Sequence, residues 1–341
     1  MLYPFYRVVS VEGITHALYL LWWVQHKHVS PVAVAAILAA GEIAITLLEV
    51  PTGRFADRFG HRRSLILGSA IQVVAMLLCW LAEGVSGLVL ASLCVALGDT
   101  FRSGADQALL YESCVAEGQP QRFQQIEAKT HSLELIGLVA MIVAGGVLVE
   151  TMGFAAAWIA ETVLAALGLA IALALASPPP APTRSAEADE TAPPTGATSR
   201  PLRLIVPAAL IGGAASATLF MAQIGESATP MHLTVLVSAI TLAEAAGAAA
   251  ARYLRPDIAT QYFLLAASAF VVAAMAAAPG FFVTGVVTLS MVIGLAEPLR
   301  ATAIQLVVER RRAEAASWAS ALDGAIRTVA LMLAGYVGGT P

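Results

Sequence analysis

Residues 48–68 read LEVPTGRFADRFGHRRSLILG, and this basic segment separates two long apolar stretches of the chain. Four arginines, one histidine and one aspartate lie between Gly53 and Arg63, whereas residues 64–82 carry no charged side chain. An apolar stretch of about 20 residues is long enough to cross the hydrocarbon core of a bilayer as a helix. The segment therefore predicts a short loop between two membrane helices, in which Gly53 and Gly60 permit a tight turn and close helix approach.

The whole chain has the composition of a membrane protein. Of its 341 residues, 58% are apolar and only 12% are charged, whereas a soluble domain carries about 25% charged residues. We therefore exclude a water-soluble globule and predict an all-α membrane protein, because helices satisfy their own backbone hydrogen bonds in lipid. The three cysteines lack the spacing and the histidine neighbours of a metal site, so neither a metal nor a cofactor is expected.

Eleven membrane helices are predicted, six before and five after a polar segment. They cover residues 4–25, 32–53, 63–83, 86–113, 130–151 and 154–177, and then residues 203–224, 231–252, 259–278, 281–306 and 315–337. Residues 178–202 are rich in Pro, Ala, Thr and acidic residues and can bury no core, which predicts a disordered cytoplasmic linker. The expected domains are a bundle at 1–177 and a second bundle at 203–341.

The basic residues predict the orientation of the chain in the membrane. With a cytoplasmic N-terminus, fifteen of the nineteen Lys and Arg residues lie on cytoplasmic segments, as the positive-inside rule requires. Glu12 and His16 interrupt the first apolar segment, so we expect a retained helix rather than a signal peptide. The chain stops where a twelfth helix would be expected to begin, and a natural absence and a truncation both remain open.

Residues 53–63 resemble the loop between helices 2 and 3 of the major facilitator superfamily, whose pattern is G-x-x-x-D-R-x-G-R-[KR]. Gly53, Asp57, Arg58, Gly60 and Arg62 fit this pattern. The neighbouring segments EVPT and SGADQALLYES, at 49–52 and 103–113, resemble a bacterial branch with many drug-efflux-like members. The resemblance implies two helical bundles, here of six and five helices with the twelfth apparently missing, in a bacterial inner membrane.

The resemblance also implies a conformational latch on the cytoplasmic side. In the family, Asp57 would dock near residues 314–317, and Arg58 or Arg62 would pair with Asp106 or Glu112. Another interpretation is that these arginines only set the topology. The expected latch residues are Gly53, Asp57, Arg58, Gly60, Arg62, Arg63 and Glu112.

Many charged side chains interrupt the predicted membrane helices. An ionised group near the bilayer centre costs at least about 2.5 kcal/mol, so such groups usually face a cavity or a partner. The candidates for binding protons or substrate are Glu12, His16, Glu42, Asp99, Arg102, Asp106, Glu297, Arg300, Asp323 and Arg327.

The candidates differ in how well they fit a functional role. Glu12 and His16 share a helix face at i,i+4, so they are the first choice for sharing a proton, although a structural hydrogen bond would explain them too. On helix 86–113 the single base Arg102 cannot neutralise both acids on its face, Asp99 and Asp106. The pairs Glu297 with Arg300 and Asp323 with Arg327 are equally well explained by self-neutralisation. Glu161 stands alone and is expected to be peripheral.

The preferred function is secondary transport by alternating access between two bundles. No nucleotide-binding loop occurs, so an ion or substrate gradient would supply the energy. We expect proton-coupled efflux of a small organic molecule or drug by a monomeric antiporter in the cell membrane, with no nucleic-acid partner. A uniporter or importer of a small metabolite, and a non-transporting sensor or scaffold, are the alternatives. An intramembrane enzyme is disfavoured because no H-E-x-x-H or G-x-G-D motif occurs.

Overall fold

The computed structural model describes residues 2–119, 122–176, 199–224, 229–251, 253–254, 258–307, 322, 324–334 and 336, and these residues form helices and connecting turns without a strand. The first half contains α1 (Tyr3–Ser10), α2 (Tyr19–Gln25), α3 (Pro31–Phe59), α4 (His61–Leu81), α5 (Gly84–Arg102), α6 (Ala105–Ala116), α7 (Phe123–Met152) and α8 (Phe154–Ala174). The second half contains α9 (Ser199–Ile224), α10 (Pro230–Ala251), α11 (Ile258–Ala277), the short 3₁₀ helix η3 (Pro279–Phe281), α12 (Phe282–Val307) and a helix at Gly324–Ala334.

Length and composition make many of these helices membrane spans. In the described part of the chain, six helices are long and apolar enough to cross a membrane: Pro31–Phe59, His61–Leu81, Gly84–Arg102, Leu133–Met152, Phe154–Ala174 and Pro230–Ala251. Shorter apolar helices lie at Ala209–Met221, Ala259–Met275, Phe282–Ala296 and Gly324–Ala334. The prediction of an all-α membrane protein is confirmed.

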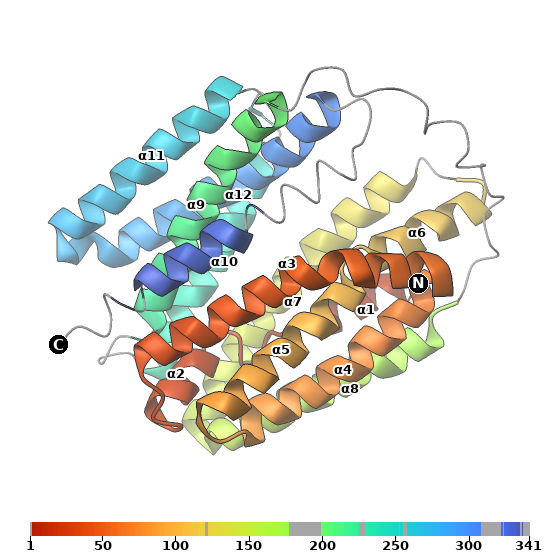
Figure 1. The fold of residues 1–341 in the computed structure, drawn as a ribbon, viewed down its shortest axis with the longest axis horizontal. Helices are drawn as coiled ribbons and strands as arrows, with labels where there is room; N and C mark the ends of the chain where they lie inside the picture. Colours follow the sequence, from red (N-terminus) through yellow and green to blue (C-terminus); the bar gives the residue numbers. More distant parts are fainter. Residues whose placement is uncertain are drawn as a thin grey trace.

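The helices form two groups that lie side by side. In Figure 1, the helices α3 to α8 lie together in red to yellow-green, and α9 to α12 lie beside them in green to blue. The groups meet through contacts of α7 with α10 and of α2 with α9. Leu233 and Val237 of α10 pack with Ile142 and Val149 of α7, so the contact lies toward the C-terminal end of α7 and the N-terminal end of α10.

Local sequence explains the ends of α3, the helix that precedes the basic segment. Ser30 accepts a hydrogen bond from the Ala33 backbone N–H at 3.3 Å, and Pro31 occupies the first turn; both are typical of a helix start. The helix continues through Pro51 to Phe59 instead of ending at residue 53. The predicted turn at Gly53 is therefore wrong, because of these two glycines only Gly60, with φ of 97°, has the backbone conformation that ends a helix.

Two predicted helices are broken in the structure. The helix predicted at 4–25 divides into α1 and α2, and the helix predicted at 86–113 divides into α5 and α6. The second break follows from Gly104, which adopts a left-handed conformation with φ of 73°. The part of the predicted linker that the structure describes, residues 199–202, already belongs to α9.

Backbone-to-backbone packing joins α10 and α12 in the second group. A side chain at Gly294 would overlap the Glu244 backbone carbonyl, and one at Gly247 would overlap the Met291 carbonyl. Close approach of this kind is the usual use of glycine between membrane helices, because packing supplies much of the association energy there.

We expect Gly294→Ala to destabilise the protein. The added methyl group meets backbone that cannot rotate aside, and overpacking of this kind costs about 1–3 kcal/mol. The matched control is Gly280→Ala, because within the described part of the chain no atom lies within 4 Å of its added methyl group. Thermal unfolding in detergent measures both variants, and equal melting temperatures would show that α10 and α12 do not approach this closely.

Candidate functional site

The break between α1 and α2 carries the most polar residues of the first span. Residues 11–18 have no continuous helix in this part of the structure, and Glu12, Thr15 and His16 lie among them. The expectation that Glu12 and His16 share one helix face is therefore wrong. Glu12 instead accepts a hydrogen bond from Nε2 of Gln72 on α4, and the His16 ring lies close to the Glu12 backbone.

Two charged residues from other helices bond to the backbone of this break. Arg102 of α5 donates to the Ser10 carbonyl at 2.5 Å. The carboxylate of Glu161 on α8 accepts from the Thr15 backbone N–H at 2.7 Å and from the Thr15 hydroxyl at 3.1 Å. The backbone N–H groups of Gly13 and Ile14 lie close to the same carboxylate. Glu161 is only 2% exposed, so the expectation that it is peripheral is wrong.

A cavity of about 350 Å³ opens beside the break. Residues of the break, α2, α3, α4, α5 and α8 line it. Its polar and aromatic lining residues are Glu12, Thr15, His16, Tyr19, Trp23, Glu42, Ser92, Asp99 and Trp158. Three carboxylates thus face the cavity, and none of the described side chains that line it is Lys or Arg. Glu12, His16, Glu42 and Asp99, which the sequence predicts as candidates, are brought together here.

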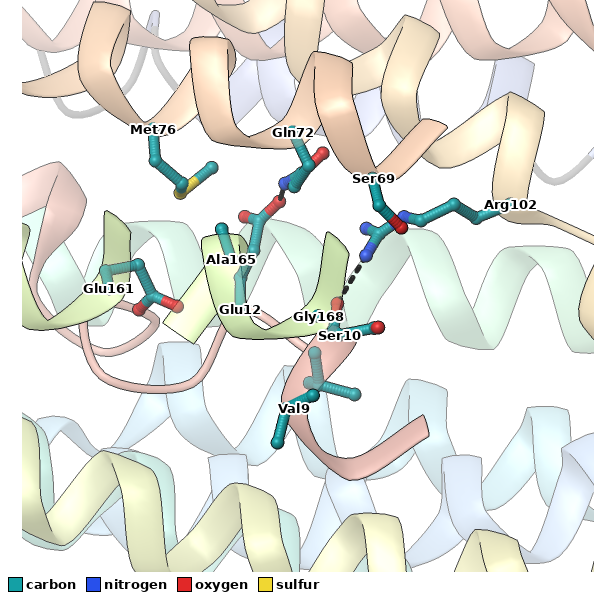
Figure 2. A pocket seen from close by; sticks show the side chains of 11 residues that line it. Val9, Ser10, Glu12, Ser69, Gln72, Met76, Arg102, Glu161, Ala165 and Gly168 are labelled. Carbon is teal, nitrogen blue, oxygen red and sulfur yellow. Dashed lines mark hydrogen bonds between the residues drawn. The ribbon is translucent and has the colours of Figure 1, made fainter. Parts of the chain in front are cut away.

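A second and much smaller cavity lies on the other side of Glu12. Figure 2 shows Glu12 bonded to Gln72 and Arg102 bonded to the Ser10 backbone, with Glu161 and Ser69 nearby. The cavity has about 10 Å³ of free volume, which is about the room that one water molecule needs. Glu12 therefore lies between a cavity large enough for a small organic molecule and a polar one of water size.

The three charges predicted on one face of helix 86–113 separate into two groups. Asp99 and Arg102 form an ion pair within α5, as their spacing predicts. Asp106 lies on α6 beyond the break at Gly104 and pairs with Arg7 of α1 at 2.8 Å. Arg7 also pairs with Glu134 of α7 at 2.6 Å. Asp106 thus contributes to packing among α1, α6 and α7 rather than to the large cavity.

The predicted latch segment makes contacts other than those expected. Arg62 donates to the carbonyls of Leu173 and Leu175 at 2.5 Å each, so it caps the C-terminal end of α8, where carbonyls lack helical partners. Glu112 lies 3.2 Å from His61 rather than from an arginine. The reason is that the end of α8 lies against Arg62, while α6 brings Glu112 beside His61.

The other latch residues lie at the surface of this structure. Asp57, Arg58 and Arg63 are exposed, and the Arg58 guanidinium lies 5.4 Å from the centre of the Phe59 ring. No atom of the described residues lies within 4 Å of the position that a side chain on Gly53 would take. The expected partner of Asp57, at residues 314–317, lies outside the described residues.

Few of the predicted site residues in the second half of the chain have described side chains. The side chains of Glu297 and Arg300 on α12, and the whole of Asp323, lie outside the described residues, whereas Arg327 is partly buried on the helix at Gly324–Ala334. Within the part of the chain that the structure describes, no three His, Cys, Asp or Glu residues are arranged to hold a metal ion.

Sequence reasoning missed Gln72, Trp158 and the role of Glu161. Gln72 lies in an apolar stretch without any charged residue, and it is 3% exposed. A lone amide or carboxylate in such a stretch is a signal by itself, because burial of a polar group without a partner is costly. The identity of the partner could not be read from the chain, since Gln72 and Glu12 are 60 residues apart.

Comparisons with known proteins give one family and several solved structures. A family model described as Major Facilitator Superfamily matches residues 9–334. The chain is similar to a bacterial homologue of the human lysosomal transporter Spinster in an inward-facing and occupied conformation, with a TM-score of 0.70 and 14% identity over 98% of this chain and 79% of that one.

Two further structures have the same architecture. The nucleoside transporter NupG has a TM-score of 0.68 and 14% identity over 99% of this chain and 88% of its own. A D-xylose–proton symporter has a TM-score of 0.66 and 11% identity over 98% and 87%. No curated protein sequence matches. At these identities the structural likenesses show a shared fold and nothing about the substrate.

Proposed function

This chain belongs to the major facilitator superfamily, and we propose that it is a proton-coupled exporter of a small organic cation. The resemblance inferred from residues 53–63 is confirmed, and with it the fold of two helical bundles. The protein is therefore a multi-pass membrane transporter. We propose the cationic substrate, the coupling to protons and the outward direction of transport.

The observation that carries the proposal is the chemistry of the large cavity. It holds three carboxylates, Glu12, Glu42 and Asp99, and none of its described lining residues is Lys or Arg. Arg102 pairs with Asp99 from outside the lining. Such a lining favours a positively charged occupant over a neutral or anionic one.

Aromatic rings support an organic cation rather than an inorganic one. Tyr19, Trp23 and Trp158 line the same cavity as the carboxylates, and aromatic faces attract organic ammonium groups. The volume of about 350 Å³ falls within the range of about 300–1,000 Å³ that is common for small-molecule sites. An aromatic and acidic cavity of this size suits an amine with a modest apolar body.

Competition for the carboxylates couples the cation to protons. A carboxyl that takes up a proton loses its attraction for the cation, so the two occupants exclude each other at Glu12. Exchange of the cation for the proton requires this mutual exclusion, because the two must not bind and cross the membrane together. Because cells commonly maintain an inward proton gradient, this exchange would drive the cation outward.

The contacts between the two helix groups support alternating access. Among the described residues, α7 meets α10 near Gly146 and Thr234. With the predicted cytoplasmic N-terminus, this contact lies in the outer half of the membrane. A tight outer contact is what an inward-open state requires.

We expect Glu12→Gln to uncouple cation movement from proton movement. The protein is reconstituted in proteoliposomes with an internal pH-sensitive dye, and tetraphenylphosphonium and ethidium serve as probe cations. The wild-type protein should release protons from acidic vesicles when a probe is added outside. The variant should lose this signal by about tenfold or more, because the amide cannot exchange a proton at neutral pH.

Glu83→Gln is the matched control, since the Glu83 side chain is 80% exposed and lies outside the cavity. It should keep the wild-type signal. Normal proton exchange in Glu12→Gln would reject the proposed proton site. Probe movement by the wild-type protein without any pH change would instead identify a uniporter.

A further inference from the structure

We propose that Arg102 and Glu161 form a two-point clamp on the broken first span and so position Glu12 and His16 in the cavity. The clamp is defined as the Arg102 bond to the Ser10 carbonyl together with the Glu161 bonds to the Thr15 N–H and hydroxyl groups. The functional consequence rests on the proposed function, whereas the clamp itself rests on the hydrogen bonds of the break.

Breaking a helix inside a membrane leaves backbone hydrogen-bonding groups without their helical partners. In a continuous helix the N–H groups of residues 13–15 would bond to the carbonyls of residues 9–11. An unsatisfied backbone group costs several kcal/mol where no water is available. Some other part of the protein must therefore satisfy these groups wherever the helix is broken.

Glu161 satisfies the donor side of the break. Its carboxylate accepts from the Thr15 N–H and the Thr15 hydroxyl, and the N–H groups of Gly13 and Ile14 lie close to it. Because all of these backbone groups are donors, two carboxylate oxygens suit the site better than an amide, whose NH2 group would oppose the N–H groups. Hydrogen bonds to an ionised group are roughly twice as strong as neutral ones.

Arg102 satisfies the acceptor side of the break. Its guanidinium donates to the carbonyl of Ser10, the last residue of α1, and also pairs with Asp99. A positive charge at the C-terminal end of a helix is favourable because carbonyl dipoles point there. Asp99 lines the large cavity, so the clamp is connected directly to the site that a ligand would occupy.

The packing against α7 shows that the break is a built feature. A side chain at Gly145 would overlap the Ile14 carbonyl, and a side chain at Gly13 would come within 2.6 Å of the Met141 Cβ atom. The unwound backbone thus lies directly against α7 while α5 and α8 hold its two ends. Figure 2 shows Arg102 and Glu161 on either side of Glu12.

The clamp fixes where Glu12 and His16 point. With Thr15 held by Glu161, both side chains line the large cavity, whereas in a continuous helix they would share a single helix face. Glu161 and Arg102 are therefore positioning residues that act through Glu12 and His16. The titratable side chains near the clamp are Tyr6, Glu12, Cys79 and Asp99.

The test measures the exposure of position 16 to the cavity, without any transport assay. A His16→Cys variant is made in a background with alanine in place of Cys79, Cys94 and Cys114. Its rate of reaction with a small cationic methanethiosulfonate reagent is then measured in proteoliposomes. Adding Glu161→Gln should slow or speed this reaction several-fold, because two N–H donors of the new amide replace an acceptor. Glu161→Asp keeps the charge and should restore part of the wild-type rate.

Arg102→Lys supplies the second variant and covers the case in which Glu161→Gln does not fold. The lysine ammonium group keeps the positive charge beside Asp99. It lacks the rigid set of N–H donors with which the guanidinium reaches both Asp99 and Ser10. We expect a several-fold change in labelling here as well. Unchanged labelling in either folded variant would overturn the clamp.

A transport measurement separates the clamp from the proposed function. In the otherwise wild-type protein, Glu161→Gln should lower probe-dependent proton release by about ten- to hundredfold, as expected for a misplacement of about 1 Å at a reacting group, and Glu161→Asp should recover part of it. Glu161→Gln should also shift the pH dependence of that proton release. If labelling changes but Glu12→Gln leaves proton exchange intact, the clamp stands and the proposed proton site fails.

Discussion

Gly146→Val should strongly reduce the rate of transport while the protein remains folded. Gly146 lies on α7, and a side chain there would overlap the Thr234 side chain on α10. The two helices belong to different groups, so valine obstructs the closing of one group on the other rather than the folding of either. Overpacking by about 1–3 kcal/mol corresponds to a shift of a two-state equilibrium by about 5- to 150-fold.

The shift is measured as access to the cavity. Leu38 lines the large cavity, as does Cys79. A cysteine in place of Leu38, in the background with alanine in place of Cys79, Cys94 and Cys114, is therefore labelled with an impermeant thiol reagent from each side of the vesicle in turn. Gly146→Val should increase labelling from the outer side and decrease it from the inner side. Thr234→Ala in the same chain removes part of the obstruction and should restore part of the wild-type pattern. Equal labelling in all variants would mean that this contact does not close the outer side.

The second large effect is expected for Arg7→Met. Arg7 of α1 pairs with Asp106 of α6 and Glu134 of α7, and the three side chains are 14%, 15% and 18% exposed. Removal of one partner from a fully buried ion pair costs about 3–5 kcal/mol, because the remaining charge stays desolvated, and these mostly buried side chains should lose a large part of that amount. We therefore expect a much lower melting temperature and a lower yield of folded protein in detergent.

Lys27→Met is the matched control for this prediction. Lys27 pairs with Glu83 at 2.5 Å, a shorter distance than either pair of Arg7, but the Glu83 side chain is 80% exposed. Exposed pairs contribute about 0–1 kcal/mol, so the melting temperature should change little. Similar losses in the two variants would contradict the view that burial, rather than distance, decides the effect. Asp106→Asn combined with Arg7→Met should recover part of the lost stability.

Much of the fold could be predicted because its determinants are local. The apolar stretches that contain α8, α10, α11 and α12 begin and end within a few residues of the predicted helices. Backbone groups in lipid must bond within their own helix, so apolar length alone predicts a span. The family could be predicted for a similar reason, since the motif at residues 53–63 is contiguous in the chain.

The candidate site could be predicted only in part. The sequence identified Glu12, His16, Glu42 and Asp99, and the structure brings them to one cavity. The sequence did not identify which acid bonds to which partner. A continuous helix at 86–113 would place Asp106 on the face of Asp99, and a single left-handed residue, Gly104, turns it toward Arg7 instead.

By itself, then, the sequence determined the membrane class, the spans and the family of this protein, because apolar length and a contiguous loop motif act through neighbouring residues. Only the tertiary structure decided that the first span is broken and that Glu161 is part of the site. The bond from Thr15 to Glu161 joins residues 146 positions apart. The local sequence of residues 3–25 favours a helix, and the break is stable only where side chains from α5 and α8 replace the hydrogen bonds that the helix loses.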